Sequence, residues 1–264
     1  MTAEQKLNEL RRTLRSLGTV GVAYSGGLDS SFLLKIALEE LGEKAVAFMG
    51  VSPAFPTRER ETAISLAASI GARLITLNTN ELELEEYISN PEDRCYYCKN
   101  HILKMIISAA RELGFLNVID GTNADDFETH RHGIRAAQEL GVRSPLSEVG
   151  LTKEEIRSLA GKIGLASANR PSSPCLATRV PYGQKITREK LAQIEGAENI
   201  LKDLGSRQVR VRHHGEIARI EVLADDFLLL LTKRDKIVKD FKKIGFKYVC
   251  LDLEGYRSGS LELS

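Results

Sequence analysis

The chain of 264 residues lacks an excess of charge of either sign, because 37 lysines and arginines stand against 36 aspartates and glutamates. A protein with so little net charge generates no strong field for gathering nucleic acid, although it can still carry a local basic patch. The chain also lacks an apolar run long enough to span a bilayer, and its first residues are charged and amphipathic, unlike a signal peptide. We therefore expect a cytoplasmic protein with neither a nucleic-acid nor a membrane partner.

Two common nucleotide-binding motifs are missing as well. No Gly-Lys-Ser/Thr follows the glycines of the chain, which excludes the ordinary P-loop. The dinucleotide fingerprint G-x-G-x-x-G is absent, and there is neither an internal repeat nor a low-complexity segment. A nucleotide site in this chain must therefore be built in another way.

A glycine-rich stretch provides that alternative. Residues 19–35 are predicted to form a short buried strand, a tight turn and the start of a helix. Gly26 and Gly27 allow a turn with positive φ, and Ser30 and Ser31 are expected to cap the helix. Backbone N–H groups in such a turn converge on one point at the positive end of the helix dipole. The stretch is therefore predicted to bind a phosphate.

Strands and helices alternate through the first part of the chain. Buried strands are expected at 20–24, 44–51, 74–77 and 117–120, and helices at 3–17, 30–41, 58–70 and 99–114. This alternation predicts an α/β fold, a parallel sheet with helices on both faces. Ligands of such sheets collect at the carboxyl ends of the strands, so the glycine loop, Ser52 and residues 121–126 should line one crevice.

The pattern changes after residue 148. A capped helix at 151–164 is followed by an irregular segment at 167–182 that holds three prolines, and we place the domain boundary there, with domains at 1–166 and 167–264. The second domain is predicted to be a small α+β unit. Its expected elements are helices at 187–204 and 225–243 and strands at 208–212, 217–222 and 247–253.

The chain has four cysteines, and a reducing compartment favours metal binding or catalysis over disulfides. Cys95 and Cys98 form a C-x-x-C just before the helix expected from residue 99, and Cys175 lies in Pro-Cys-Leu-Ala-Thr-Arg. Cys250 reads as a buried strand residue and is a poor metal ligand. Three thiolates on a [4Fe-4S] cluster would leave one iron open for a hydrosulfide. Cys175 alone as the sulfur source, or redox or structural cysteines, remain alternatives.

Charged residues supply the other candidates. Asp29, within the glycine loop, either caps the following helix or holds a Mg²⁺ ion beside the bound phosphate. Asp125, at the end of a strand, can serve Mg²⁺ or the reacting group, or can simply form a turn. Arg210 and Arg212 share one face at strand period and suit a phosphate monoester, with a solvated edge as the alternative. Arg257 is a candidate to join them.

The hexapeptide Ser25-Gly26-Gly27-Leu28-Asp29-Ser30 resembles the SGGxDS loop of the N-type ATP pyrophosphatases, the PP-loop superfamily, which split ATP between the α and β phosphates and adenylate a substrate oxygen. The order of SGGLDS, the C-x-x-C, Gly-Thr-Asn-Ala-Asp-Asp, Pro-Cys-Leu-Ala-Thr-Arg and the basic strand resembles the LarE family. These ATP-dependent sulfur transferases make the nickel-pincer nucleotide cofactor of lactate racemase. The resemblance implies an adenine nucleotide alpha-hydrolase-like domain.

The resemblance also implies a reaction. The enzyme would adenylate a carboxylate of pyridinium-3,5-biscarboxylic acid mononucleotide, release AMP and pyrophosphate, and leave a thiocarboxylate. Sulfur would come through a [4Fe-4S] cluster on Cys95, Cys98 and Cys175, as in the three-cysteine members, or from Cys175 alone, which would become dehydroalanine. ATP, Mg²⁺ and this cluster are therefore the expected cofactors, and the physiological sulfur donor stays open.

Further site residues follow from the same resemblance. The loop residues, Ser52 and Asp125 would serve the nucleotide. Arg210, Arg212 and Arg257 would grip the substrate phosphate near Glu198 and Glu221, and family members assemble into homo-oligomers. The rival functions are a PP-loop tRNA thiolase, an ammonia-using synthetase, and a nucleotide-binding or iron–sulfur regulatory module without turnover.

Overall fold

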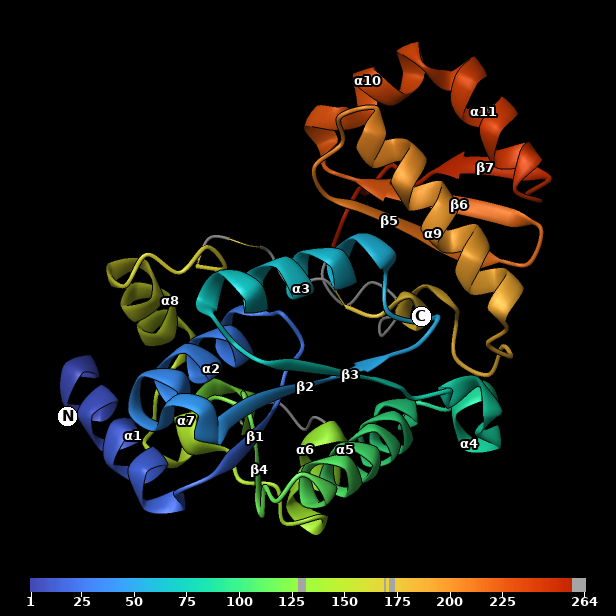
Figure 1. The fold of residues 1–264 in the computed structure, drawn as a ribbon. Helices are drawn as coiled ribbons and strands as arrows, with labels where there is room; N and C mark the ends of the chain where they lie inside the picture. The colour runs from blue at the N-terminus through green and yellow to red at the C-terminus, as the bar shows by residue number, and fades with distance from the viewer. Residues whose placement is uncertain (128–131, 169, 171–173, 258–264) are drawn as a thin grey trace. The chain divides into compact units, whose positions relative to one another are not determined.

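The computed structural model describes residues 1–127, 132–168, 170 and 174–257 (Figure 1). Its contacts divide the chain into two units, Met1–Glu81 with Asp93–Ser173, and Leu82–Glu92 with Pro174–Ser264. The segment Leu82–Glu92 therefore belongs with the C-terminal part of the chain, although it lies between the two stretches of the first unit in the sequence. The boundary expected after residue 166 stays a prediction, and each unit is considered by itself.

The first unit is built on a four-stranded sheet in the order β3-β2-β1-β4. All neighbours are parallel, and the strands are β1 (Val20–Ala23), β2 (Ala45–Val51), β3 (Leu74–Asn78) and β4 (Asn117–Asp120). Ala23 pairs with Phe48 on one side and with Asp120 on the other, so β1 and β4 end at the same level. The glycine loop leaves β1 at this edge, as expected for a parallel α/β sheet.

Helices cover both faces of this sheet, which confirms the predicted fold class. Along β2, Ala45, Ala47 and Met49 enter one core, and Val46 and Phe48 enter the other. The first core is closed by helices α1 (Ala3–Leu17), α2 (Leu28–Leu41), α3 (Thr57–Ile70), α7 (Pro145–Glu148) and α8 (Lys153–Lys162). The second is closed by α5 (Arg94–Glu112) and α6 (His132–Glu139).

The second unit contains a smaller mixed sheet. Its strands, in the order β5-β6-β7, are β5 (Val209–His214), β6 (Ile217–Val222) and β7 (Tyr248–Leu251). The first pair is antiparallel, as expected, and β7 joins β6 in parallel. The helices of the unit are α4 (Glu85–Ile88), α9 (Arg188–Asp203), α10 (Phe227–Thr232) and α11 (Arg234–Lys243). The small α+β unit predicted for the C-terminal part is therefore confirmed.

Four local expectations are wrong. Cys250 lies in strand β7 as expected, but it is exposed and not buried. Helix α5 begins at Arg94, so the C-x-x-C lies inside its first turns and not before it. Helix α2 begins at Leu28 after Gly27, without a side-chain cap, because the Ser30 hydroxyl turns back toward the loop. The single helix expected at 225–243 is divided at Lys233, where the backbone leaves the helical conformation between α10 and α11.

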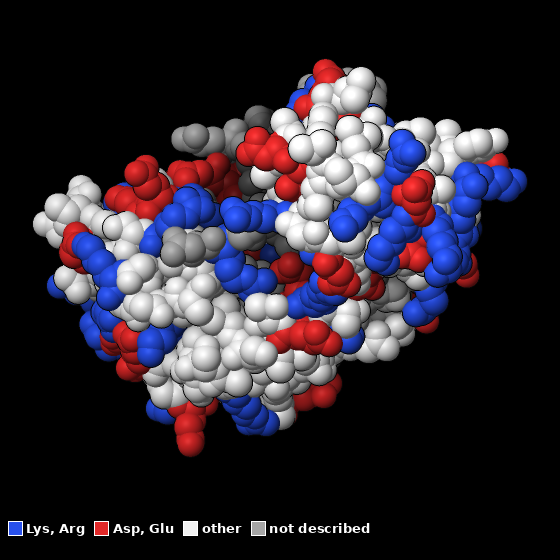
Figure 2. Space-filling model, turned by 90° about the horizontal axis from the view of Figure 1, so that it is seen from above, with Lys and Arg blue, Asp and Glu red and all other residues white. Residues whose placement is uncertain are grey.

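The surface shows the balance of charge noted in the sequence. On the face drawn in Figure 2, acidic and basic side chains are interspersed. Among the helices that the structure describes, none is both long and apolar enough to cross a membrane.

Candidate active site

The glycine loop is held tightly between its neighbours. Gly26 has a φ of +75°, and a Cβ added there would lie 2.3 Å from the Cβ of Ala63 in α3. A side chain at this position would therefore meet both a disfavoured conformation and a neighbouring helix. The Ser25 and Ser30 hydroxyls lie 3.1 Å apart, and that of Ser30 donates to the Gly27 carbonyl at 3.2 Å. No described side chain caps α2 at Gly27, which leaves its first amides for an outside acceptor such as phosphate.

Asp29 contacts two other segments of the first unit. Its Oδ2 accepts hydrogen bonds from the Lys153 ammonium and from Asn123 Nδ2, the latter at 3.3 Å. Its Oδ1 is buried without a hydrogen-bond partner among the described residues. Burial raises the pKa of Asp29, and Asp126 raises it further, while Lys153 opposes the shift. A carboxylate whose second oxygen has no hydrogen-bond partner in the described part of the chain fits a Mg²⁺ ligand. Phosphate oxygens of a bound nucleotide would then supply other ligands of the ion.

Lys153 is a residue that sequence reasoning missed. It is the first residue of α8, whose start is fixed by a capping box between Thr152 and Glu155. Its backbone amide donates to Asp125 Oδ2 at 2.8 Å while its side chain reaches Asp29. The capped start was visible in Thr-Lys-Glu-Glu, but nothing local indicated that this lysine would reach a loop far away in the sequence.

The remaining nucleotide-site candidates follow strands of the same sheet. Asp125 lies in the segment after β4 and, through the Lys153 amide, contacts the same lysine as Asp29. Ser52 directly follows β2, and its hydroxyl accepts the Ala54 amide at 3.3 Å. Because β1, β2 and β4 are parallel neighbours, their carboxyl ends bring the glycine loop, Ser52 and Asp125 to one edge. Lys35, farther along α2, pairs with Glu39 of the same helix.

The C-x-x-C lies at the start of α5, in the first unit. Cys95 is exposed and Cys98 is half-buried, and residues three apart share one face of a helix. The Cys98 thiol lies 4.0 Å from Glu81 Oε1. The next residue, Lys99, donates from Nζ to Asp120 Oδ2 at 3.0 Å. Two adjacent thiols on one turn suit two ligand positions of a thiolate-bound cluster.

Cys175 lies in the second unit, immediately before a 3₁₀ turn at Leu176–Arg179. Its carbonyl accepts hydrogen bonds from Thr178 Oγ1 at 2.8 Å and from Arg179 Nη1 at 3.0 Å. Arg179 also donates to the Pro174 carbonyl and forms a buried ion pair with Glu198, at 2.8 and 3.2 Å. Arg179 was seen in the sequence only as the end of a motif, and the structure shows that it fixes the backbone that carries Cys175.

The basic strand is buried, so the solvated-edge alternative is wrong. Arg212 donates to the Thr178 carbonyl at 2.9 Å and pairs with Glu221 at 2.8 Å. The Arg210 guanidinium lies over the Tyr256 ring, 5.3 Å from its centroid. Burial lowers the pKa of Arg210, and the nearby charge of Arg179 lowers it further. Arg257, by contrast, is exposed and pairs with Glu254.

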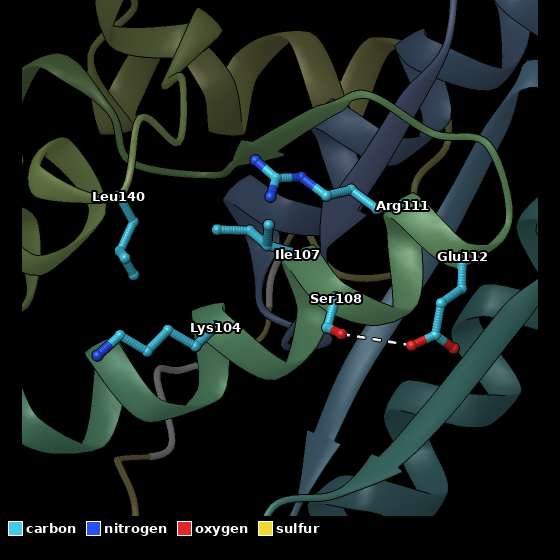
Figure 3. A pocket seen from close by; sticks show the side chains of 6 residues that line it. All are labelled: Lys104, Ile107, Ser108, Arg111, Glu112 and Leu140. Carbon is cyan, nitrogen blue, oxygen red and sulfur yellow. Dashed lines mark hydrogen bonds between the residues drawn. The ribbon is translucent and has the colours of Figure 1, made fainter.

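No group of three or more histidine, cysteine, aspartate or glutamate side chains is arranged to hold a metal within the described parts of the chain. Cys95 and Cys98 belong to the first unit and Cys175 to the second. The three-thiolate site therefore stays a prediction. A hollow on α5 is shown in Figure 3, and its lining includes Lys104, Ser108 and Arg111 but none of the candidate site residues.

No protein-family model matches the chain. A pyridinium-3,5-bisthiocarboxylic acid mononucleotide synthase from Lactiplantibacillus plantarum is 36% identical over 264 residues, which cover 98% of this chain and 95% of that protein. The chain belongs to this synthase family. An uncharacterised protein from Synechocystis sp. is 42% identical over 260 residues, 98% of this chain and 97% of its own length.

The chain is also similar, at lower identity, to a GMP synthase. A glutamine-hydrolysing GMP synthase component from Methanococcus maripaludis is 27% identical over 213 residues, 76% of this chain and 68% of that protein. Together with the glycine loop, these likenesses identify the chain as a member of the PP-loop superfamily. It is an enzyme, an ATP-dependent sulfurtransferase.

Proposed function

We propose that this enzyme adenylates a carboxylate of pyridinium-3,5-biscarboxylic acid mononucleotide and converts it to a thiocarboxylate, a step in making the nickel-pincer cofactor. The observation that carries the proposal is the match over nearly the full length of both chains with a relative that is named as a synthase of the bisthiocarboxylic product. Hydroxide is a poor leaving group, so a carboxylate does not exchange oxygen for sulfur unaided. ATP use supports the proposal because AMP is a much better leaving group.

In the first half of the reaction a carboxylate oxygen attacks the α-phosphorus of ATP, and pyrophosphate leaves. The uncapped amides of α2 and the glycine loop are suited to hold the phosphates. Asp29, whose Oδ1 has no hydrogen-bond partner among the described residues, would hold Mg²⁺, which supplies positive charge to the phosphates when bound. Lys153 brings a second cation to the same carboxylate, so it is suited to neutralise charge that develops on pyrophosphate.

In the second half a sulfur nucleophile attacks the acyl carbon, and AMP leaves. We propose that Cys95, Cys98 and Cys175 hold a [4Fe-4S] cluster, which when bound supplies the sulfur that replaces the carboxylate oxygen. The shared helical face of Cys95 and Cys98 supports two of the three ligands. In the alternative, the Cys175 thiolate attacks, and later loss of its Cβ–S bond and Cα proton leaves dehydroalanine. The firmly held backbone of Cys175 favours a role for that residue in either case.

The substrate's phosphate has a candidate site in the second unit. Arg179 pairs with Glu198 and Arg212 with Glu221, whereas no described carboxylate pairs with Arg210. The buried group therefore carries surplus positive charge, which a phosphate monoester would balance. Burial lowers the pKa of Arg210 and the charge of Arg179 lowers it further, so a bound phosphate would stabilise this buried cation. Arg257 is proposed to join the site through its neighbour Tyr256.

The function is tested by incubating the enzyme with ATP, Mg²⁺ and the mononucleotide. Pyrophosphate should appear only when the mononucleotide is present, and mass spectrometry should show oxygen replaced by sulfur in the product. Formation of an amide from added ammonia instead would favour a synthetase. Absence of pyrophosphate with the mononucleotide and with other carboxylates would favour a binding module.

The sulfur source is tested by measuring iron and acid-labile sulfide per chain after anaerobic purification. The cluster predicts about four of each in the wild type and their loss in Cys95→Ala, Cys98→Ala and Cys175→Ala. Absence of iron after anaerobic reconstitution would favour Cys175 as the sacrificial donor, with dehydroalanine at that position after turnover.

A further inference from the structure

The start of α5 and the glycine loop both contact one short segment of the first unit, Asp120–Asn123. On one side, Lys99 Nζ donates to Asp120 Oδ2 at 3.0 Å, one residue after Cys98 and one helical turn after Cys95. On the other side, the segment packs against the first turn of α2. The cysteine pair and the nucleotide loop are thus linked through a single stretch of chain.

Asp120 is firmly fixed at the end of β4. It is 1% exposed, and besides Lys99 it accepts hydrogen bonds from the Thr122 amide at 3.1 Å, the Thr122 hydroxyl at 3.0 Å and the Ser144 hydroxyl at 2.8 Å. Burial alone would raise the pKa of Asp120, but Lys99 and these donors outweigh burial and lower it. Asp120 therefore stays ionised at neutral pH, and Lys99 is the cation that pairs with it.

On the loop side, the backbone of Gly121 packs closely against the backbone of Ser30. A Cβ added to Gly121 would lie 2.7 Å from the Ser30 amide nitrogen and 2.9 Å from the Ser30 Cα. Two residues on, Asn123 Nδ2 donates to Asp29 Oδ2 at 3.3 Å. A phosphate bound to the first amides of α2, or a cation bound to Asp29, therefore shifts the contacts that Gly121 and Asn123 make with the loop. A close-packed interior transmits such shifts to neighbouring residues.

We propose that Lys99 is a positioning residue that couples the nucleotide site to the cysteine pair, through its ion pair with Asp120 and the contacts of Gly121 and Asn123 with the glycine loop. The inference rests on the proposed function and gives it an order of events. Nucleotide bound in the glycine loop fixes the position of the α5 turn that carries Cys95 and Cys98. The two thiols are therefore in place to deliver sulfur only when an adenylate can form.

The test measures how nucleotide changes the reactivity of the two thiols. The full chain, reduced and freed of metal, is alkylated with iodoacetamide with and without saturating α,β-methylene ATP and Mg²⁺, and each cysteine is followed by peptide mass spectrometry. In the wild type the analogue should change the alkylation rate of Cys95 or Cys98 about fivefold or more. In Lys99→Met the two rates should agree within about twofold, while the analogue still binds.

A matched control lies on the same helix. Lys104→Met removes a cation from the exposed side of α5, at the hollow of Figure 3, and should keep the full nucleotide response. Cys250, exposed in the second unit, serves as an internal reference whose rate should not change. Asp120→Asn should abolish the response as Lys99→Met does, and the double variant should lose no more than either single variant.

The proposal is overturned if Lys99→Met responds to nucleotide as the wild type does, since Lys99 would then only neutralise Asp120. It is overturned equally if the wild type shows no response although the analogue is bound. Pyrophosphate release with the mononucleotide is measured on the same preparations. If that reaction fails while the thiols respond to nucleotide, the proposed substrate is wrong and the coupling stands.

Discussion

At the scale of single residues, the buried ion pair with Glu198 holds Arg179, whose guanidinium donates to the Cys175 carbonyl. The two side chains are 1% and 3% exposed. Arg179→Met would leave a buried carboxylate uncompensated, and we expect it to lower the free energy of unfolding by about 3–5 kcal/mol. Urea denaturation measures this change. Arg12→Met, at a position 71% exposed, should change it by less than about 0.5 kcal/mol, and equal effects would contradict the account.

Asp29 gives a prediction for pH dependence. Because its pKa is raised in the folded protein, protonation of Asp29 favours folding, and its contribution to stability is lost as the pH rises from the ordinary value of 3.8 through the raised one. Asp29→Asn should therefore raise the melting temperature at neutral pH, with a difference that narrows toward acid pH, although the variant loses Mg²⁺-dependent turnover. Asp235→Asn, at a side chain 96% exposed, should show no such pH-dependent gain. A constant difference from pH 4 to about 8 would contradict the prediction.

At the scale of elements, the contact between the end of β4 and the first turn of α2 can be tested by adding a methyl group at Gly121. Gly121→Ala places a Cβ 2.7 Å from the Ser30 amide nitrogen, and we expect a loss of about 1–3 kcal/mol in stability together with weaker ATP binding. Gly161→Ala is the control, because a Cβ within α8 meets no heavy atom within 4 Å and should stabilise the helix by up to about 1 kcal/mol. Thermal unfolding and ATP titration distinguish the two, and unchanged ATP affinity in Gly121→Ala would count against the coupling.

The elements of the sheet could be predicted because their signals are local. The strand at 117–120 and the helix at 3–17 have the expected bounds, since periodicity and flanking turns define them. The start of α5 could not, because Arg94 is 3% exposed and its position depends on tertiary packing. The break between α10 and α11 at Lys233 contains neither glycine nor proline, so no local residue predicts it.

The site was predictable in part for the same reason. The glycine loop could be found from six adjacent letters, whereas Lys153 reaches Asp29 from 124 positions away and Arg179 acts through Glu198. Pairings over such distances depend on the fold. The segment Leu82–Glu92 is a further example, because its contacts belong to the second unit, where Asn90 Nδ2 donates to the Pro181 carbonyl at 2.7 Å.

At the scale of the whole molecule, the near balance of charge distinguishes the proposed substrate from tRNA. The formal net charge is +1, and acidic and basic side chains are interspersed on the face in Figure 2. We therefore expect filter binding to detect no tRNA complex at micromolar protein and about 150 mM salt. Tight binding of tRNA with a steep salt dependence would contradict this expectation and favour a tRNA thiolase.

The central claim is that one chain couples ATP cleavage to sulfur transfer onto a carboxylate. The most direct measurement is the amount of thiocarboxylate and of pyrophosphate formed from the mononucleotide by the wild type and by Cys175→Ala, side by side. The account predicts both products in the wild type and pyrophosphate without thiocarboxylate in Cys175→Ala. Wild-type enzyme that releases no pyrophosphate, or a Cys175→Ala variant that still forms thiocarboxylate, would contradict it.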